Sequence, residues 1–238
     1  THMRDYRLDF VKGFLVFAMV VYHTMNYFTN APPEVYGYLR FVNGAFVFIS
    51  GYVISVFYAP RADRGSAQIA SRLIARGLKL LLIFTALNLT ISTLGLTSYK
   101  SIEFGLGGFL SDLAGIYLRG DSDAMAFRIL APISYVLMIA PLVIRLHWRA
   151  GIFVALVLAL TLGYAWLDRE WPNLYFVLVG LAGLVAGRGF AFHDIAPIQN
   201  RTIAVSALIV LALAMNLLSG NVATYAVGIF LTLKVVYD

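Results

Sequence analysis

Eight apolar runs, most of them long enough to cross a lipid bilayer, constrain this chain more than any other feature. Because a backbone in lipid must satisfy its polar groups internally, and the runs far exceed the strands of a membrane barrel, each is expected to be an α-helix. With 61% hydrophobic and 13% charged residues, the sequence predicts an all-α, polytopic membrane helix bundle that forms one domain over residues 1–238. The expected spans are residues 9–28, 41–58, 73–96, 126–146, 151–167, 174–190, 203–218 and 222–236.

The cationic residues predict how the bundle is oriented. If the amino terminus lies in the cytoplasm, thirteen of the 18 Lys and Arg residues fall on the inner side and five on the outer side. This asymmetry follows the positive-inside rule. We therefore expect a multi-pass protein of a bacterial inner membrane, with both termini cytoplasmic.

The first run, RLDFVKGFLVFAMVVYHTMNYF, carries an ionisable residue near each end, and such residues in lipid are costly and mark functional sites. Lys12 and His23 are eleven positions apart, which places them within about 20° of each other on a helix and about 16 Å apart along its axis. Asp9 lies three residues before Lys12, and Asn26 three after His23. The run therefore predicts a polar seam through about half of the bilayer.

Three patterns in the first third of the chain resemble the membrane-bound acyltransferase superfamily. They are R-L-D-F-x-K-G from Arg7, the Lys-x10-His pair of Lys12 and His23, and F-V-F-I-S-G-Y at residues 46–52. The superfamily includes acyltransferase family three, the OpgC-type glucan succinyltransferases and, more distantly, heparan-alpha-glucosaminide N-acetyltransferase. The resemblance implies transfer of an acyl group from a cytoplasmic acyl-CoA to a hydroxyl of an extracytoplasmic glycan or similar acceptor.

Under this hypothesis His23 is the general base, which takes the proton of the acceptor hydroxyl as it attacks the thioester. Lys12 holds the donor or stabilises developing negative charge, and Asp9 keeps Lys12 oriented. The alternative for His23 is a hydrogen bond between helices of the bundle, worth about 1 kcal/mol.

Polar residues on the first two spans are candidates for contacts with the substrate. Asn43 and Ser50 are seven residues apart, so they share a helix face. We include Asn26, Asn43 and Ser50 in the substrate-binding set. The pair Ser50-Gly51 also fits close helix packing by small residues, which is the favoured interpretation.

Three cations follow the second span. Arg72, Arg76 and Lys79 recur at intervals of four and three residues, which places them on one helical face at the cytoplasmic end of the third span. One interpretation is anchoring to anionic lipid headgroups. The other is a cradle for the phosphates of coenzyme A, since an Arg fork suits phosphate oxygens.

The longest connection, residues 97–125, is expected outside the membrane. Its stretch FGLGGFLSDLAGIYL at residues 104–118 is apolar and Gly-rich, which suggests an interfacial or re-entrant helix. The carboxylates of this segment, including Asp112 and Asp121, are best explained by solvation. Orientation of His23 or binding of an acceptor hydroxyl stays an alternative for one of them.

Several classes of site are disfavoured. The chain has no Cys, which excludes thiolate chemistry, and its four His residues are scattered, so no metal site is expected. The cations are spread between apolar runs, which argues against nucleic-acid binding. The expected partners are the lipid bilayer, the acceptor and other membrane proteins.

Two other functions remain open besides the acyltransferase. The superfamily usually has more membrane helices than the eight found here, so a truncated chain, or a non-catalytic subunit or scaffold of a larger complex, fits the sequence. A transporter is a third hypothesis, because a polar seam can also pass a solute. The absence of an inverted repeat between the two halves argues against it.

Overall fold

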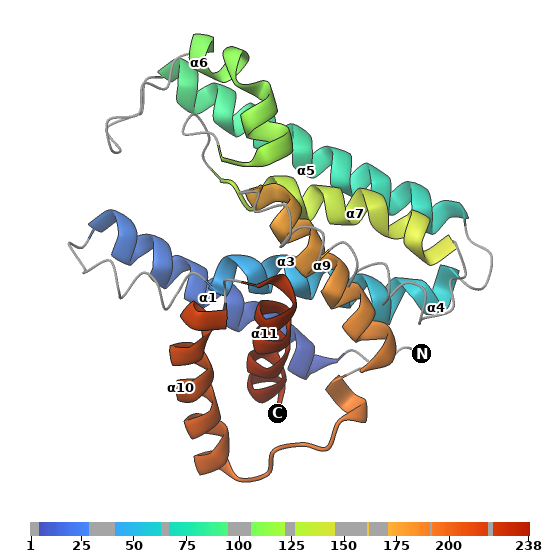
Figure 1. Ribbon diagram of the computed structural model, residues 1–238. Helices are drawn as coiled ribbons and strands as arrows, with labels where there is room; N and C mark the ends of the chain where they lie inside the picture. Colours follow the sequence, from blue (N-terminus) through green and yellow to red (C-terminus); the bar gives the residue numbers. More distant parts are fainter. Residues whose placement is uncertain are drawn as a thin grey trace.

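All regular structure in the described part of the protein is helical (Figure 1). This agrees with the predicted all-α class. The computed structural model describes residues 5–28, 41–62, 67–94, 106–121, 127–145, 161, 171–190, 192–218 and 221–238.

The described residues form α-helices, two π-helices and one 3₁₀-helix. In chain order they are α1 (Tyr6–Phe28), α3 (Phe41–Val53), the π-helix η1 (Ile54–Tyr58), α4 (Ala59–Ala62), α5 (Ala67–Leu94), α6 (Leu106–Ser111), the π-helix η2 (Gly115–Arg119), α7 (Leu130–Arg145), α9 (Pro172–Gly189), the 3₁₀-helix η3 (Phe192–Asp194), α10 (Arg201–Leu218) and α11 (Val222–Tyr237).

Four helical stretches are long and apolar enough to cross a membrane, namely Tyr6–Met25, Phe41–Tyr58, Gln68–Thr93 and Pro172–Gly189. Three further apolar helices are shorter, within α7, α10 and α11. The expected span at residues 151–167 lies outside the described residues apart from Thr161. The arrangement of eight spans with cytoplasmic termini therefore stays a prediction.

The third span begins earlier than the sequence predicts. Helix α5 starts at Ala67, whereas the apolar run starts at residue 73. The extra residues include Arg72, and further cations follow within the next two turns. Arg, Lys, Ala and Gln all favour a helix, so the helix extends beyond the apolar run.

Helices α3 and α9 form the centre of the molecule and pack with their backbones almost in contact (Figure 1). Gly180, Gly183 and Gly187 recur on one face of α9. A methyl group added at Gly187 would lie 2.7 Å from the carbonyl oxygen of Tyr52, and one at Gly183 would lie closer still to that of Phe48. Because higher numbers on α3 meet higher numbers on α9, the two helices run parallel.

A second close contact joins α5 to α7. A methyl group added at Gly77 of α5 would lie 2.8 Å from the carbonyl oxygen of Ser134 on α7 and 2.6 Å from the side chain of Met138. α7 also packs on α9, where Val136 lies against Gly180. The α5–α7 pair is thus attached to the central α3–α9 pair.

Helix α1 lies at the edge of the bundle against α3 and α11 (Figure 1). Its buried residues, Leu8, Val11, Leu15 and Ala18, recur at intervals of three and four and form one stripe. The opposite side is open, since Phe17 is 67% exposed. That side fits contact with lipid.

The segment expected to be interfacial or re-entrant is two short helices, α6 and η2, rather than a full span. Phe109 and Ile116 are buried and pack with Phe84 of α5 and Ala131 of α7. The chain leaves η2 through Gly120, whose φ of 79° favours glycine. We call α6 and η2 together the cap.

Candidate functional site

The polar seam of α1 contains an ion pair. Nζ of Lys12 lies 3.2 Å from Oδ1 of Asp9, one turn earlier on the helix. The lysine side chain is 41% exposed and the aspartate side chain 35%. The pairing that the spacing of three residues predicts is therefore present, while the catalytic roles of both residues stay a prediction.

Lys12 and His23 both lie at the border of the packed stripe of α1. Each is half-buried, whereas Val16, between them in the sequence, is mostly exposed. The imidazole ring of His23 lies edge-on to Tyr22, with ring centroids 5.3 Å apart. Asn26 belongs to α1, but its side chain lies outside the described residues. The seam thus follows the junction between α1 and its neighbours.

The Lys12 end of the seam meets the end of the second span. Nζ of Lys12 lies 5.9 Å from the centroid of the Phe57 ring, on η1. The next residue, Tyr58, accepts a hydrogen bond through its hydroxyl from Nη1 of Arg76. Cζ of Arg76 lies 5.8 Å from the centroid of the same tyrosine ring. Successive aromatic residues of η1 therefore contact one cation of α1 and one of α5.

The predicted cation face of α5 is present and open. Arg72, Arg76 and Lys79 are all exposed on the same helix. Arg76 is held by Tyr58, whereas Arg72 and Lys79 form no hydrogen bond or ion pair with a described residue. The face is available to an anion from solvent or from the membrane surface.

Asn43 and Ser50 have different surroundings. Oγ of Ser50 donates to the carbonyl oxygen of Phe46, 2.7 Å away on the same helix. Gly51 lies against the backbone of Gly180, so the small-residue motif serves helix packing, as the favoured interpretation holds. Asn43 is half-buried in the first turn of α3. Their contact with a substrate stays a prediction.

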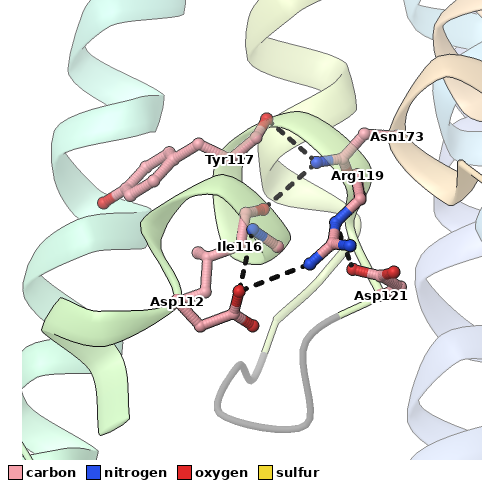
Figure 2. A network of polar contacts seen from close by, with 7 residues as sticks. Asp112, Ile116, Tyr117, Arg119, Asp121 and Asn173 are labelled. Carbon is pink, nitrogen blue, oxygen red and sulfur yellow. Dashed lines mark hydrogen bonds and ion pairs between the residues drawn. The ribbon is translucent and has the colours of Figure 1, made fainter. Parts of the chain in front are cut away.

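The cap contains an ionic cluster that the sequence analysis did not anticipate (Figure 2). Arg119 lies between two carboxylates, with Nη2 3.5 Å from Asp112 and Nε 3.3 Å from Asp121. Asp112 also accepts a hydrogen bond from the backbone of Gly115 at 3.1 Å. Solvation alone therefore does not explain these two acids. In Figure 1 the cap lies over α5 and beside the start of α9. Orientation of His23 by a carboxylate of this segment stays a prediction.

Asn173, at the start of α9, fastens the cap to the bundle (Figure 2). Its side-chain nitrogen donates to the carbonyl oxygens of Ile116 and Tyr117, each at 3.1 Å. The hydroxyl of Tyr135 donates to the same Tyr117 oxygen at 2.6 Å. Pro172 marks the helix start in the sequence, but no sequence pattern points to the contact of Asn173 with the cap.

Two cavities lie away from the seam. One, of about 430 Å³, is almost wholly apolar and lies between α9 and α11. The other, of about 450 Å³, opens where the start of α1 meets the end of α11, with Arg7, His193 and Tyr237 in its wall. His23 lines neither cavity.

Comparison with known families gives one result. A sequence model described as heparan-alpha-glucosaminide N-acetyltransferase, catalytic, matches residues 4–200, which is well over half of the chain. No curated protein and no solved structure matches the chain. The narrower resemblance to acyltransferase family three and the OpgC-type proteins stays a prediction.

Proposed function

Because the chain belongs to the heparan-alpha-glucosaminide N-acetyltransferase catalytic family, we propose that it is a membrane acyltransferase that uses the seam of α1. In this proposal an acyl-CoA binds at the inner end, near Lys12. The acceptor binds at the outer end, near His23. The observation that carries the proposal is that these two residues lie half-buried on one border of α1, with Lys12 already oriented by Asp9.

The charges at the inner end support a phosphate-bearing donor. Lys12 and the cations of α5, Arg72, Arg76 and Lys79, lie on helices that meet at η1. Coenzyme A carries a diphosphate and a 3′-phosphate, and guanidinium groups bind such oxygens with paired hydrogen bonds. Lipid anchoring by the same cations is the alternative that the experiment below also tests.

The separation along α1 suits a donor with a long arm. Eleven residues at 1.5 Å each place His23 about 16 Å from Lys12 along the axis. Coenzyme A carries its thioester at the end of a flexible pantetheine arm, away from its phosphates. When the phosphates bind at Lys12, the thioester can therefore extend along the seam toward His23.

The chemistry assigned to His23 is general base catalysis. Its neutral imidazole takes the proton from the acceptor as the acceptor oxygen or nitrogen attacks the thioester carbonyl. The carbon–sulfur bond then breaks, coenzyme A leaves as the thiolate, and the imidazolium returns the proton to that sulfur. No redox partner or metal is needed.

The family description narrows the substrates to be tested first. It names acetyl transfer to the nitrogen of a glucosaminide, whereas the resemblance to the wider superfamily implies a hydroxyl of a glycan. We propose acetyl-CoA as the first donor to test, and amino sugars alongside neutral glycans as acceptors. The membrane of residence is proposed to be the bacterial inner membrane, with the donor on the cytoplasmic side.

The test is transferase activity of the purified protein in lipid nanodiscs, measured by release of free coenzyme A and by mass spectrometry of the acceptor. His23→Ala should lower kcat by about 10²- to 10⁴-fold, the usual contribution of a general base. Lys12→Ala should raise the KM for the donor. Lys12→Arg should raise the KM less, because the charge is kept. Thr24→Ala, an exposed neighbour of His23, is the matched control.

Two outcomes would overturn the proposal. Full activity of His23→Ala would remove His23 from the mechanism. If the unaltered protein transfers no acyl group to any acceptor and binds no coenzyme A, the hypothesis of a non-catalytic subunit replaces that of an enzyme. Donor binding that survives Arg72→Ala with Arg76→Ala would assign those two cations to lipid.

A further inference from the structure

The π-helix η1 brings together two cations that lie far apart in the sequence. Its last two residues, Phe57 and Tyr58, contact Lys12 of α1 and Arg76 of α5 respectively. Short π-helical turns occur often at functional sites. Neither aromatic residue has a role in the function proposed above, so their position needs its own explanation.

On one side of η1, Phe57 contacts the ammonium group of Lys12. The ammonium of Lys12 has the carboxylate of Asp9 at 3.2 Å and the Phe57 ring centroid at 5.9 Å. A carboxylate and an aromatic face are the two kinds of group that attract an ammonium. Together they restrict a long side chain that is otherwise 41% exposed.

On the other side, Tyr58 holds the arginine twice. The phenol oxygen accepts from Nη1 of Arg76, and the ring faces the guanidinium with its centroid 5.8 Å from Cζ. A guanidinium has five N–H donors, so the bond to Tyr58 leaves most of them available. Arg76 is exposed and can present those donors to a ligand.

The two contacts follow from the geometry of one helix end. Consecutive side chains of a helical turn point in different directions, so Phe57 faces α1 while Tyr58 faces α5. Among the described residues the charged group in contact with either cation is Asp9 alone. Two cations beside one carboxylate leave this cluster of Asp9, Lys12 and Arg76 with a net positive charge.

We infer that Phe57 and Tyr58 are positioning residues that hold Lys12 and Arg76 as two halves of one binding site for the phosphates of the donor. The inference rests on the proposed function, because it takes coenzyme A as the ligand. It adds that the site is shared between α1 and α5 and that η1 sets the position of its two cations. The rings themselves contact the cations and do not touch the reacting atoms.

The two cations are partly exposed, and contacts of exposed charges contribute little to stability. Phe57 and Tyr58 are themselves half-buried and pack against the hydrophobic core, so the test replaces them with leucine, which keeps apolar bulk. The leucine variants are expected to change ligand binding more than the melting temperature. A residue with a merely structural role would show the opposite pattern.

The experiment measures the dissociation constant of coenzyme A on the detergent-solubilised full chain, at low and high salt. Tyr58→Leu removes the ring and the hydroxyl and should weaken binding about three- to fivefold, the size of an exposed cation–π contact. Phe57→Leu should act similarly. Tyr58→Phe keeps the ring and should lose less affinity than Tyr58→Leu. High salt should reduce all the differences.

A double variant and a matched control complete the test. Tyr58→Leu combined with Arg76→Ala should bind no more weakly than Arg76→Ala alone, since the tyrosine acts through the arginine. Phe10→Leu, at an exposed phenylalanine on the lipid side of α1, should leave binding unchanged. In the active enzyme the same variants should raise the KM for acetyl-CoA and leave kcat within about twofold.

The outcomes separate this inference from the proposed function. If Arg76→Ala and Lys12→Ala leave the affinity for coenzyme A unchanged, or the unaltered protein does not bind it, the donor site itself is wrong and the inference falls with it. If those variants weaken binding while Tyr58→Leu and Phe57→Leu do not, only the positioning role is wrong. Additive effects in the double variant would also overturn it.

Discussion

Replacing Gly187 by Ala should destabilise the contact between α3 and α9, which forms the centre of the bundle. The added methyl carbon would lie 2.7 Å from the carbonyl oxygen of Tyr52 and 2.9 Å from Cβ of Ser55, whereas ordinary contact begins at 3.4 Å. The shortfall, 3.4 minus 2.7, is 0.7 Å. Because a backbone carbonyl cannot rotate away, the two helices must separate by about that distance.

A separation of this size has a substantial cost. A gap of 0.5–1 Å loses about a quarter to a half of the dispersion energy of each contact that it opens, and overpacking of a core typically costs about 1–3 kcal/mol. We expect the free energy of unfolding to fall by about 2 kcal/mol, which corresponds to a fall of about 4–8 °C in melting temperature for a chain of this length.

The assay is thermal unfolding of the detergent-solubilised protein, and the same helix supplies the control. Gly189, two residues later, has nothing within 4 Å of an added methyl group. Gly189→Ala should therefore be neutral or slightly stabilising, since alanine reduces the freedom of the unfolded chain. Equal melting temperatures for Gly187→Ala and the unaltered protein would refute the tight backbone contact.

Three further predictions concern the cap, the orientation in the membrane and the contact of α3 with η3. Asn173→Ala should cost about 1–3 kcal/mol, seen as faster proteolysis of the cap, because the carbonyl oxygens of Ile116 and Tyr117 each lose a donor; resistance equal to the unaltered protein would contradict this. The chain has no native Cys, so cysteines at Ser71 and Ser111 should react with impermeant reagents from inside and outside respectively, and the reverse pattern would invert the topology. Tyr52→Phe should lower the melting temperature, since a buried N–H donor loses its acceptor; an unchanged value would contradict that contact.

Features that depend on neighbouring residues in the sequence could be predicted. The helical runs follow from length and apolarity, because lipid leaves a chain no other way to satisfy its backbone. The pairing of Lys12 with Asp9 follows from a spacing of three residues on a helix. The position of the third span was predicted, although its start at Ala67 was missed because the cations of its first turns lie outside the apolar run.

Features that depend on tertiary packing could not be predicted. Tyr58 and Arg76 are 18 residues apart, and Asn173 and Tyr117 are 56 apart. No periodicity in the chain encodes such pairs. The sequence placed Lys12 and Arg76 in separate roles because it gave no sign that the second span ends in a π-helical turn between them.

The acids of the cap illustrate a different limit. Composition alone made solvation the best explanation for Asp112, and the carboxylate is indeed partly exposed. It is also paired with Arg119 and bonded to the backbone of Gly115. A charged residue in a loop is assigned to water when its partner cannot be identified, and here the partner lies seven residues later on a π-helix that the sequence did not predict.

The π-helical turn at Ile54–Tyr58 has a consequence for insertions and deletions. Such a turn contains one residue more than an α-helical turn needs, so this site resembles an inserted residue that the helix has absorbed. Deletion of Val56 should convert the turn to a regular α-helix and keep the second span intact. The side chains that follow, Tyr58 included, would keep their register against the bundle, because the residue removed is the one that the π-helical turn had absorbed. The same deletion inside a regular α-helix would rotate every following side chain by about 100°, so this turn is the point of the second span that tolerates a change of length.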